Sequence, residues 1–187
     1  MHNNHNNYLP KRKSPHATWS EYAGGLYFIT IVTENRTPYF GKINDGKILL
    51  YPSGKIAQTS ILNIEHFYSY CKLVNYVVMP NHIHLIIFID ENLLPYKKRN
   101  LNIVNSDPTN KNKATQCNSW LSLVIGHLKS FITRQARKGG NKFGWQERYH
   151  DHIIRNMEDF RIISNYIDHN IQNWESDCFN TSIDHDM

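Results

Sequence analysis

The sequence predicts an α+β fold in which an antiparallel sheet of split β-α-β topology is followed by one added C-terminal helix. Four short segments are dense in aromatic and β-branched residues, as buried strands are. Two segments between them repeat apolar residues at helical spacing, and a third follows the last strand. With 187 residues, 40% of them hydrophobic, the chain suits a single domain with its own core.

Residues 26–33 (LYFITIVT) are predicted to form the first strand of the sheet, and it should be buried. Residues 41–50 supply turns or a short hairpin. Residues 55–68 predict the first helix, because apolar and small residues recur near helical spacing. The residues on that expected stripe are Ile56, Ser60, Ile64 and Phe67, with Ile61 beside them.

Two further apolar runs, residues 71–79 (CKLVNYVVM) and 82–89 (HIHLIIFI), are separated by Pro80-Asn81. Proline interrupts a strand and both residues favour turns, so these runs predict an antiparallel hairpin. The polar stretch 90–116 predicts a long flexible loop.

After this loop we expect a second helix, which Ser119 can cap and which ends near Gly139-Gly140. A strand over 149–155 and a last helix over 158–173 follow. The expected apolar stripes consist of Leu121, Val124, Ile125, Leu128 and Ile132 in the first of these helices, and of Phe160, Ile163, Ile167 and Ile171 in the last. The order β-α-β-β-α-β-α is that of a ferredoxin-like sheet with an added helix.

The chain divides into three parts. Residues 1–20 form an expected flexible basic arm, residues 21–174 one domain, and residues 175–187 an acidic tail. No run approaches the roughly 20 apolar residues of a membrane helix, and the N-terminus lacks the apolar stretch of a signal peptide. We therefore expect a cytoplasmic protein that does not contact a membrane.

The charge of the chain indicates a polyanionic partner. The formal net charge is +5, but four of the 16 acidic residues lie in the tail. Without them the 21 basic residues exceed the acidic ones by nine. Such an excess favours nucleic acid, because neutralised phosphates release counterions, although it does not distinguish DNA from RNA.

Two histidine pairs are candidates for a metal site. Alternate residues of a strand share a face, so His82 and His84 are aimed at one point, and they stand in an otherwise unbroken apolar strand. His150 and His152 have the same spacing but lie among charged residues that could satisfy them without metal. We prefer the first pair as the metal site and assign the second pair, with Arg155, a positioning or structural role.

The last predicted helix carries Tyr166 and Asn170, which are four residues apart and therefore neighbours on one face, off the apolar stripe. The preceding helix carries a basic face, since residues 116–146 contain no acidic residue. Its candidate DNA-binding residues are Lys129, Arg134, Arg137, Lys138 and Lys142. Phosphate contacts there would position DNA without reading its sequence.

Several blocks of the chain resemble the REP-associated tyrosine transposases, which belong to the single-tyrosine HUH transposases. The blocks are LYFITIVTENRTPYFG, VVMPNHIHLIIFI, the helix with Lys129 and Phe131, WQERYHDHIIRN and SNYIDHNIQNW. PNHIH and the WQERYHDHIIR block are the most specific, and the likeness spans about residues 8–174. Relatives usually place proline after the asparagine of the last block, where this chain has Ile171, so we expect the helix to continue.

The resemblance implies an activity and a role for each residue. In that family the histidine pair holds a divalent metal, which here implies Mg²⁺ or Mn²⁺ on His82 and His84, with Asn170 completing the site. It implies Tyr166 as the nucleophile that forms a 5′-phosphotyrosine intermediate on single-stranded DNA carrying a hairpin. Two imidazoles and an amide suit Mn²⁺ at least as well as Mg²⁺, which prefers oxygen ligands.

Other functions remain open from the residues alone. A basic ferredoxin-like sheet can bind single-stranded RNA or a DNA hairpin without catalysis, by stacking bases on strand aromatics such as Tyr27 and Phe28. A descendant that binds hairpins without cutting them is another alternative. The sequence does not distinguish a monomer from a homodimer with shared active sites.

Overall fold

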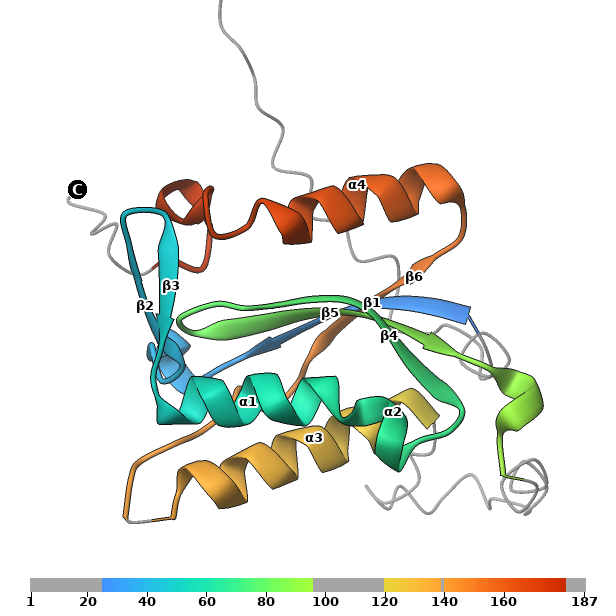
Figure 1. The fold of residues 1–187 in the computed structure, drawn as a ribbon, viewed down its shortest axis with the longest axis horizontal. Helices are drawn as coiled ribbons and strands as arrows, with labels where there is room; N and C mark the ends of the chain where they lie inside the picture. The colour runs from blue at the N-terminus through green and yellow to red at the C-terminus, as the bar shows by residue number, and fades with distance from the viewer. Residues whose placement is uncertain (1–24, 96–119, 139, 181–187) are drawn as a thin grey trace, which may run out of the picture.

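The computed structural model describes residues 25–95, 120–138 and 140–180, and it confirms the predicted α+β class (Figure 1). The main sheet has the order β4-β5-β1-β6, and each neighbouring pair is antiparallel. Its strands are β1 (Gly25–Val32), β4 (Cys71–Val78), β5 (His82–Ile89) and β6 (His150–Ile154). The helices are α1 (Pro52–Leu62), α2 (Ile64–Phe67), α3 (Trp120–Ala136) and α4 (Met157–Asp168). A separate hairpin joins β2 (Gly41–Asn44) to β3 (Lys47–Leu50).

Helices cover both faces of the sheet. Helices α1 and α3 lie on one face, and α4 lies on the other (Figure 1). Residues of β1 alternate between the two cores: Tyr27 and Ile29 pack on the α1 and α3 side, while Phe28 packs with Ile163 and Ile167 of α4. The two-residue period of a strand thus builds two cores from one segment.

The buried sheet corrects one alternative function. Tyr27 and Phe28 are only 0% and 6% exposed, so neither ring can stack on a base. The strand aromatics that would form the RNA-binding surface of a non-catalytic module are core residues instead.

The first helix differs from the prediction in its start and in its buried face. It begins at Pro52, because proline is compatible with the first turn of a helix, and α1 ends before Asn63. The buried residues of α1 are Gly54, Ala57 and Ile61, and Ile64 is the buried residue of α2. Phe67, which was expected on the apolar stripe, is 68% exposed. The expected single helix is divided at Asn63, so Phe67 belongs to the separate α2 and does not continue the buried side of α1.

The stripe predicted for α3 is confirmed, since all five of its residues are buried. Helix α4 is shorter than expected: Asn156 caps it by accepting a hydrogen bond from the Asp159 N–H at 2.8 Å, and the helix ends at Asp168. Asn170 therefore lies in the turn that follows rather than on the helix.

The C-terminal segment corrects the expected boundary of the acidic tail. Residues 174–176 form a 3₁₀ helix, and the side chains of Asp177 and Phe179 beyond it are buried. Residues 175–180 thus belong to the folded domain. The expected N-terminal arm and most of the expected loop lie outside the described residues, as do residues 181–187. Within the described ranges, no helix combines the length and apolarity needed to cross a bilayer.

Candidate active site

The first histidine pair lies at the start of β5, under α4. His82 and His84 face Val32 and Thr30 of β1, and both are 0% exposed. Their ring centroids are 4.6 Å apart. The strand alternation predicted from the sequence therefore brings two imidazoles to one buried point. Burying such polar rings is costly unless their nitrogens have partners, so the surrounding contacts define what the site can do.

His82 is held by the neighbouring residue of the β4-β5 turn. The Asn81 amide donates from Nδ2 to the carbonyl oxygens of Arg36 and Phe179 at 3.1 and 2.7 Å. This fixes the amide with Oδ1 toward His82, whose Nδ1 lies 2.8 Å away and must donate. The proton is thereby placed on Nδ1. His82 Nε2 keeps its lone pair and is a buried atom without a hydrogen-bond partner.

His84 is held from both sides. Its Nδ1 lies 2.8 Å from Thr30 Oγ1, and its Nε2 lies 3.2 Å from the Tyr166 hydroxyl. Phe28 stacks on the ring at a centroid distance of 5.2 Å. Burial lowers the pKa of His84 to about 3, and burial lowers the pKa of His82 well below its ordinary value, with smaller contributions from His84 and Arg36. Both imidazoles are neutral at physiological pH and can act as ligands.

Helix α4 and its C-terminal turn supply the other two predicted residues. Tyr166 reaches His84 from the helix, and Asn170 is 1% exposed, with its Oδ1 buried and without a partner. Burial raises the pKa of Tyr166, and the nearby Asp177 raises it further. The phenol is therefore protonated at neutral pH in this state. The structure thus brings His82, His84, Tyr166 and Asn170 together.

Sequence reasoning missed the segment that closes this site. The Phe179 ring lies 4.6 Å from the His82 ring, and the Trp174 ring lies 6.1 Å from it. Arg36 holds the segment: its Nη1 donates to the Cys178 carbonyl at 2.8 Å, and its guanidinium lies 5.3 Å from the Phe179 ring centre. Only Asn81 had a local signal, its position next to the histidine in PNHIH. Cys178 and Phe179 come from a segment interpreted as a tail, whereas Arg36 and Trp174 lie in the expected domain without a signal for this role.

The second histidine pair is arranged differently. His150 is exposed, and His152 Nε2 lies 2.9 Å from Asp159 Oδ2 at the start of α4. In the strand register Thr30 stands between His84 and His150, so both pairs are on the same face of the sheet. Arg155, immediately after β6, is exposed. A positioning role for these residues stays a prediction.

Two of the five predicted DNA-binding residues hold the chain itself. Lys129 Nζ donates to the carbonyl oxygens of Gln146 and Glu147 at 2.9 and 3.2 Å. Arg137 donates to the Phe143 carbonyl from Nε and Nη2 at 2.9 and 2.7 Å. Arg134, Lys138 and Lys142 are exposed. Arg137 is exposed as well, so the DNA-binding role of all five residues stays a prediction.

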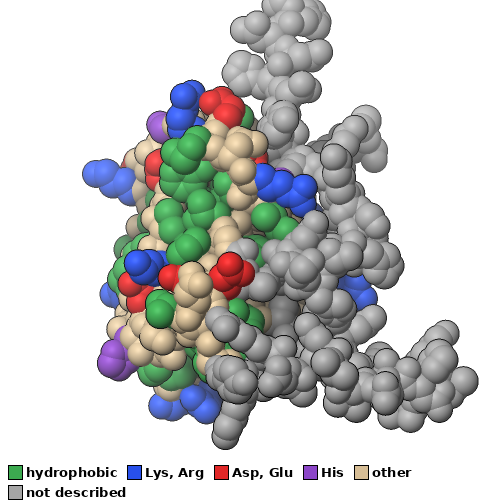
Figure 2. All heavy atoms as spheres, turned by 90° about the vertical axis from the view of Figure 1, so that its right-hand side faces the viewer, with side chains coloured by type: hydrophobic (Ala, Val, Ile, Leu, Met, Phe, Trp, Pro, Cys, Tyr) green, Lys and Arg blue, Asp and Glu red, His purple; other side chains and the backbone are tan. Residues whose placement is uncertain are grey.

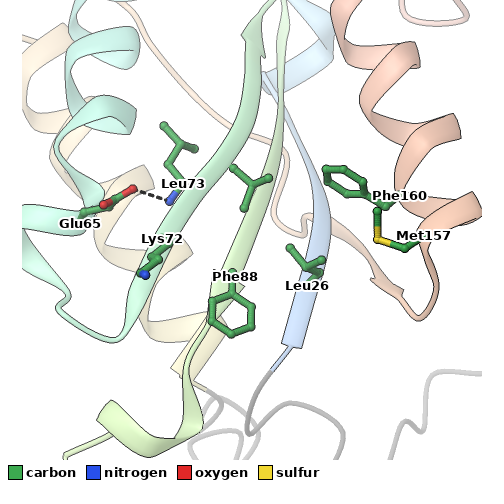
Figure 3. A pocket seen from close by; sticks show the side chains of 8 residues that line it. Leu26, Glu65, Lys72, Leu73, Phe88, Met157 and Phe160 are labelled. Carbon is green, nitrogen blue, oxygen red and sulfur yellow. Dashed lines mark hydrogen bonds between the residues drawn. The ribbon is translucent and has the colours of Figure 1, made fainter.

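An apolar groove lies on another side of the molecule from the histidine site. Figure 2 shows hydrophobic side chains gathered there, and Figure 3 shows the groove that they line. It measures about 490 Å³ and is bounded by β1, β4, β5, α2 and α4. Its lining residues are Leu26, Glu65, Lys72, Leu73, Val74, Phe88, Met157 and Phe160. Glu65 accepts a hydrogen bond from the Leu73 N–H at 3.0 Å, so its carboxylate is already engaged. The groove lacks converging groups for catalysis.

The histidine site fits a divalent cation by the chemistry of its free atoms. His82 Nε2 and Asn170 Oδ1 are both buried and unpaired, and such atoms are costly without a ligand. Among the described residues, no cluster of three or more His, Cys, Asp and Glu side chains could hold a metal. A cation at this point would thus depend on the two imidazoles and the Asn170 amide.

Comparisons with known proteins give relatives over most of the chain. No protein-family model matches. An uncharacterised protein of Haemophilus influenzae is 32% identical over 154 residues, which covers 82% of this chain and 83% of that protein. A second Haemophilus influenzae protein, named as a candidate REP-associated tyrosine transposase, is 28% identical over 160 residues, or 79% of this chain and 70% of the relative.

A solved structure shares the fold. It is a REP-associated tyrosine transposase bound to a REP hairpin, and it matches with a TM-score of 0.52 at 19% identity, covering 89% of this chain and 74% of its own. Its mixed α+β fold agrees with the four-stranded antiparallel sheet described above. In sequence the chain thus resembles a REP-associated tyrosine transposase, and it shares the fold of one.

Proposed function

We propose that the protein is a metal-dependent DNA strand transferase that cuts and rejoins single-stranded DNA through a 5′-phosphotyrosine intermediate. The observation that carries this proposal is the meeting of His82, His84, Tyr166 and Asn170, with the Tyr166 hydroxyl 3.2 Å from His84. His84 on β5 and Tyr166 on α4 are 82 positions apart in the chain, and Asn170 lies in the turn that follows α4.

Tyr166 is the proposed nucleophile. Its phenolic oxygen would form a bond to phosphorus, and the bond from phosphorus to the 3′ oxygen would break. The phenolic proton leaves the tyrosine, and the departing oxygen takes up a proton to become a 3′-OH. That hydroxyl, or one from another strand, can attack the phosphotyrosine and restore the enzyme. The reaction exchanges one phosphodiester for another and needs no nucleotide hydrolysis.

His82, His84 and Asn170 are the proposed protein ligands. A bound Mg²⁺ or Mn²⁺ ion would supply positive charge to the phosphate oxygens and favour the ionised phenol. The protein fixes the ligands in advance: Asn81 leaves the lone pair of His82 on Nε2, and Thr30 contacts the far nitrogen of His84. Such contacts behind the ligands orient them and set their tautomers.

The proposed substrate is single-stranded DNA with a hairpin. The solved relative was captured with a REP hairpin, and the exposed Arg134, Lys138 and Lys142 give this chain a basic surface for phosphates. Tyr166 contacts the histidine of its own chain, so one copy suffices to assemble the site. We therefore propose that a monomer can cut DNA.

Covalent capture tests the proposal. A labelled single strand with a hairpin and flanking bases is incubated with the protein and Mn²⁺, and products are separated on a denaturing gel. We expect a protein-DNA adduct with the wild type and with Tyr51→Phe, a matched control at an exposed tyrosine. Tyr166→Phe removes only the attacking oxygen, so it should keep the fold and hairpin binding but form no adduct.

The assay also separates the competing functions. An adduct that persists in Tyr166→Phe would assign the nucleophile to another tyrosine, which peptide mapping would name. A wild-type protein that binds the hairpin tightly and yields no adduct with either metal would instead establish a non-catalytic hairpin-binding protein.

A further inference from the structure

Asp177 is a buried carboxylate beside the histidine site with no role in the proposed chemistry so far. It follows the 3₁₀ helix Trp174–Ser176 and is 8% exposed. A carboxylate is costly to bury unless its oxygens are hydrogen-bonded. Its two oxygens have different partners: Oδ1 accepts from the Phe179 N–H at 2.7 Å, and Oδ2 accepts from Asn170 Nδ2 at 3.4 Å.

The second contact determines which end of the Asn170 amide points into the site. An amide carries its oxygen and its NH₂ group at opposite corners, so a carboxylate that accepts from Nδ2 turns Oδ1 away from itself. Oδ1 is the buried atom left without a partner, as is Nε2 of His82. The reverse orientation would set the amide oxygen against a carboxylate, where two acceptors repel each other.

The contact with Asp177 and the two unpaired atoms agree on one orientation. The NH₂ group of Asn170 is directed to Asp177, which leaves Asn170 Oδ1, together with His82 Nε2, as a buried atom free to contact a cation.

We propose that Asp177 is a positioning residue that holds the Asn170 amide with its oxygen toward the cation site formed with His82 and His84. This inference rests on the proposed function, because it requires that site to bind a metal. Asp177 acts on the metal through Asn170, and its carboxylate is needed because both of its oxygens accept hydrogen bonds. Asparagine at 177 has only one oxygen and can serve one of the two donors.

The test measures Mn²⁺ affinity of the full-length, metal-free protein by calorimetric titration in the absence of DNA. Asp177→Asn should weaken binding by about 10-fold or more, in the range found for residues that orient metal ligands. Glu175→Gln is the matched control: it removes one charge from an exposed residue of the same segment and should leave the affinity unchanged. Circular dichroism confirms that each variant is folded.

The decisive variant exchanges the two residues, as Asn170→Asp with Asp177→Asn. Asparagine at 177 can accept from the Phe179 N–H with its oxygen and donate to the new carboxylate at 170, whose other oxygen faces the site. Mn²⁺ affinity should return at least to that of the wild type. This rescue is not expected if Asp177 only holds the C-terminal segment in place.

Three results would overturn the positioning role: unchanged affinity in Asp177→Asn, equal loss in Glu175→Gln, or a folded exchange variant that stays weak. His82→Ala distinguishes this failure from that of the proposed function. If His82→Ala binds Mn²⁺ as the wild type does, the cation site itself is wrong. If His82→Ala loses binding while Asp177→Asn retains it, the site stands and only the positioning role is wrong.

Discussion

At the scale of single residues, the site is built from groups whose neighbours decide their chemical state. His82 and His84 have the same residue type and the same burial, but one is oriented by Asn81 and the other lies between Thr30 and Tyr166. Both imidazoles are kept neutral by burial. A neutral imidazole can bind a cation, whereas a protonated one cannot, so burial keeps the pair in the state that the proposed metal site requires.

The buried histidines should make folding sensitive to acid. An unfolded histidine takes up a proton near pH 6.5, but the pKa of folded His84 is about 3. Between these values the unfolded state binds more protons, so the free energy of unfolding falls as the pH is lowered from about 6.5 toward 3. The slope should reach about 1.4 kcal/mol per pH unit for each such histidine. Urea unfolding with a chelator, from about pH 7 to pH 5, measures it.

His84→Gln isolates the contribution of this residue. Glutamine does not titrate, so the free energy of unfolding of the variant should fall less steeply on acidification. The slope should be smaller than that of the wild type by about 1.4 kcal/mol per pH unit, the contribution of one bound proton. An unchanged slope in His84→Gln would show that this imidazole is protonated in the folded protein and would contradict its assignment as a neutral ligand.

At the scale of elements, the two sides of α3 make different contacts: one side is buried in the core, and the other holds a neighbouring segment of the chain. The stripe of five buried residues packs against the sheet, as its spacing predicts. On the other side, Lys129 and Arg137 donate to backbone carbonyls of residues 143–147, and Trp145 Nε1 donates to Thr133 Oγ1 at 3.0 Å. The sequence predicts this basic side as a DNA-binding face. In the structure, two of its residues also hold residues 143–147, the segment before β6.

The remaining basic surface of α3 and the following turn should determine the salt dependence of DNA binding. Replacing Arg134, Lys138 and Lys142 together by Gln should flatten the plot of log K against log salt concentration. The expected change is up to about 0.7 per lost phosphate contact for a single strand. Titrations of a labelled hairpin strand over a series of salt concentrations provide the slope.

A matched triple variant on another surface controls for net charge. Lys42, Lys47 and Lys55 are exposed on the β2-β3 hairpin and α1, and their change to Gln removes the same charge. Its slope should stay close to that of the wild type. Equal flattening in both triple variants would mean that binding responds to overall charge, and an unchanged slope in the first would place the DNA elsewhere.

At the scale of the whole molecule, the site exists only in the folded chain. Tyr166 is 82 residues from its histidine partner, and Asn81 contacts the Phe179 carbonyl 98 residues away. A cation held by these groups should therefore bind the native state and not the unfolded one, which couples metal binding to global stability.

Metal should therefore raise the melting temperature. At Mn²⁺ near 100 times its dissociation constant, the stabilisation should be about 2.7 kcal/mol. Thermal unfolding with and without Mn²⁺ should show the shift in the wild type and in His150→Ala, but not in His82→Ala. If His150→Ala abolishes the shift and His82→Ala preserves it, the metal pair was assigned to the wrong strand.

Local pattern determined the order of strands and helices along the chain, the hairpin around Pro80-Asn81 and the stripe of α3, because each depends on residues close together in the sequence. Family resemblance is confirmed by the relatives and the shared fold. The two-residue period also placed His82 and His84 on one face. Helical spacing predicted Tyr166 and Asn170 as neighbours on one helix, whereas α4 ends at Asp168 and Asn170 lies in the turn after it. The chemical roles of these residues stay predictions.

Only the tertiary structure decided how the site is enclosed. Helix α1 begins at Pro52 and buries other residues than the expected stripe, and Lys129 donates to backbone carbonyls. From the expected tail, Phe179 packs against His82 and Asp177 contacts Asn170. None of these contacts has a periodic signature. Their partners are distant in the chain, so the contacts form only where packing of the whole domain brings a donor to an acceptor or a ring to a ring.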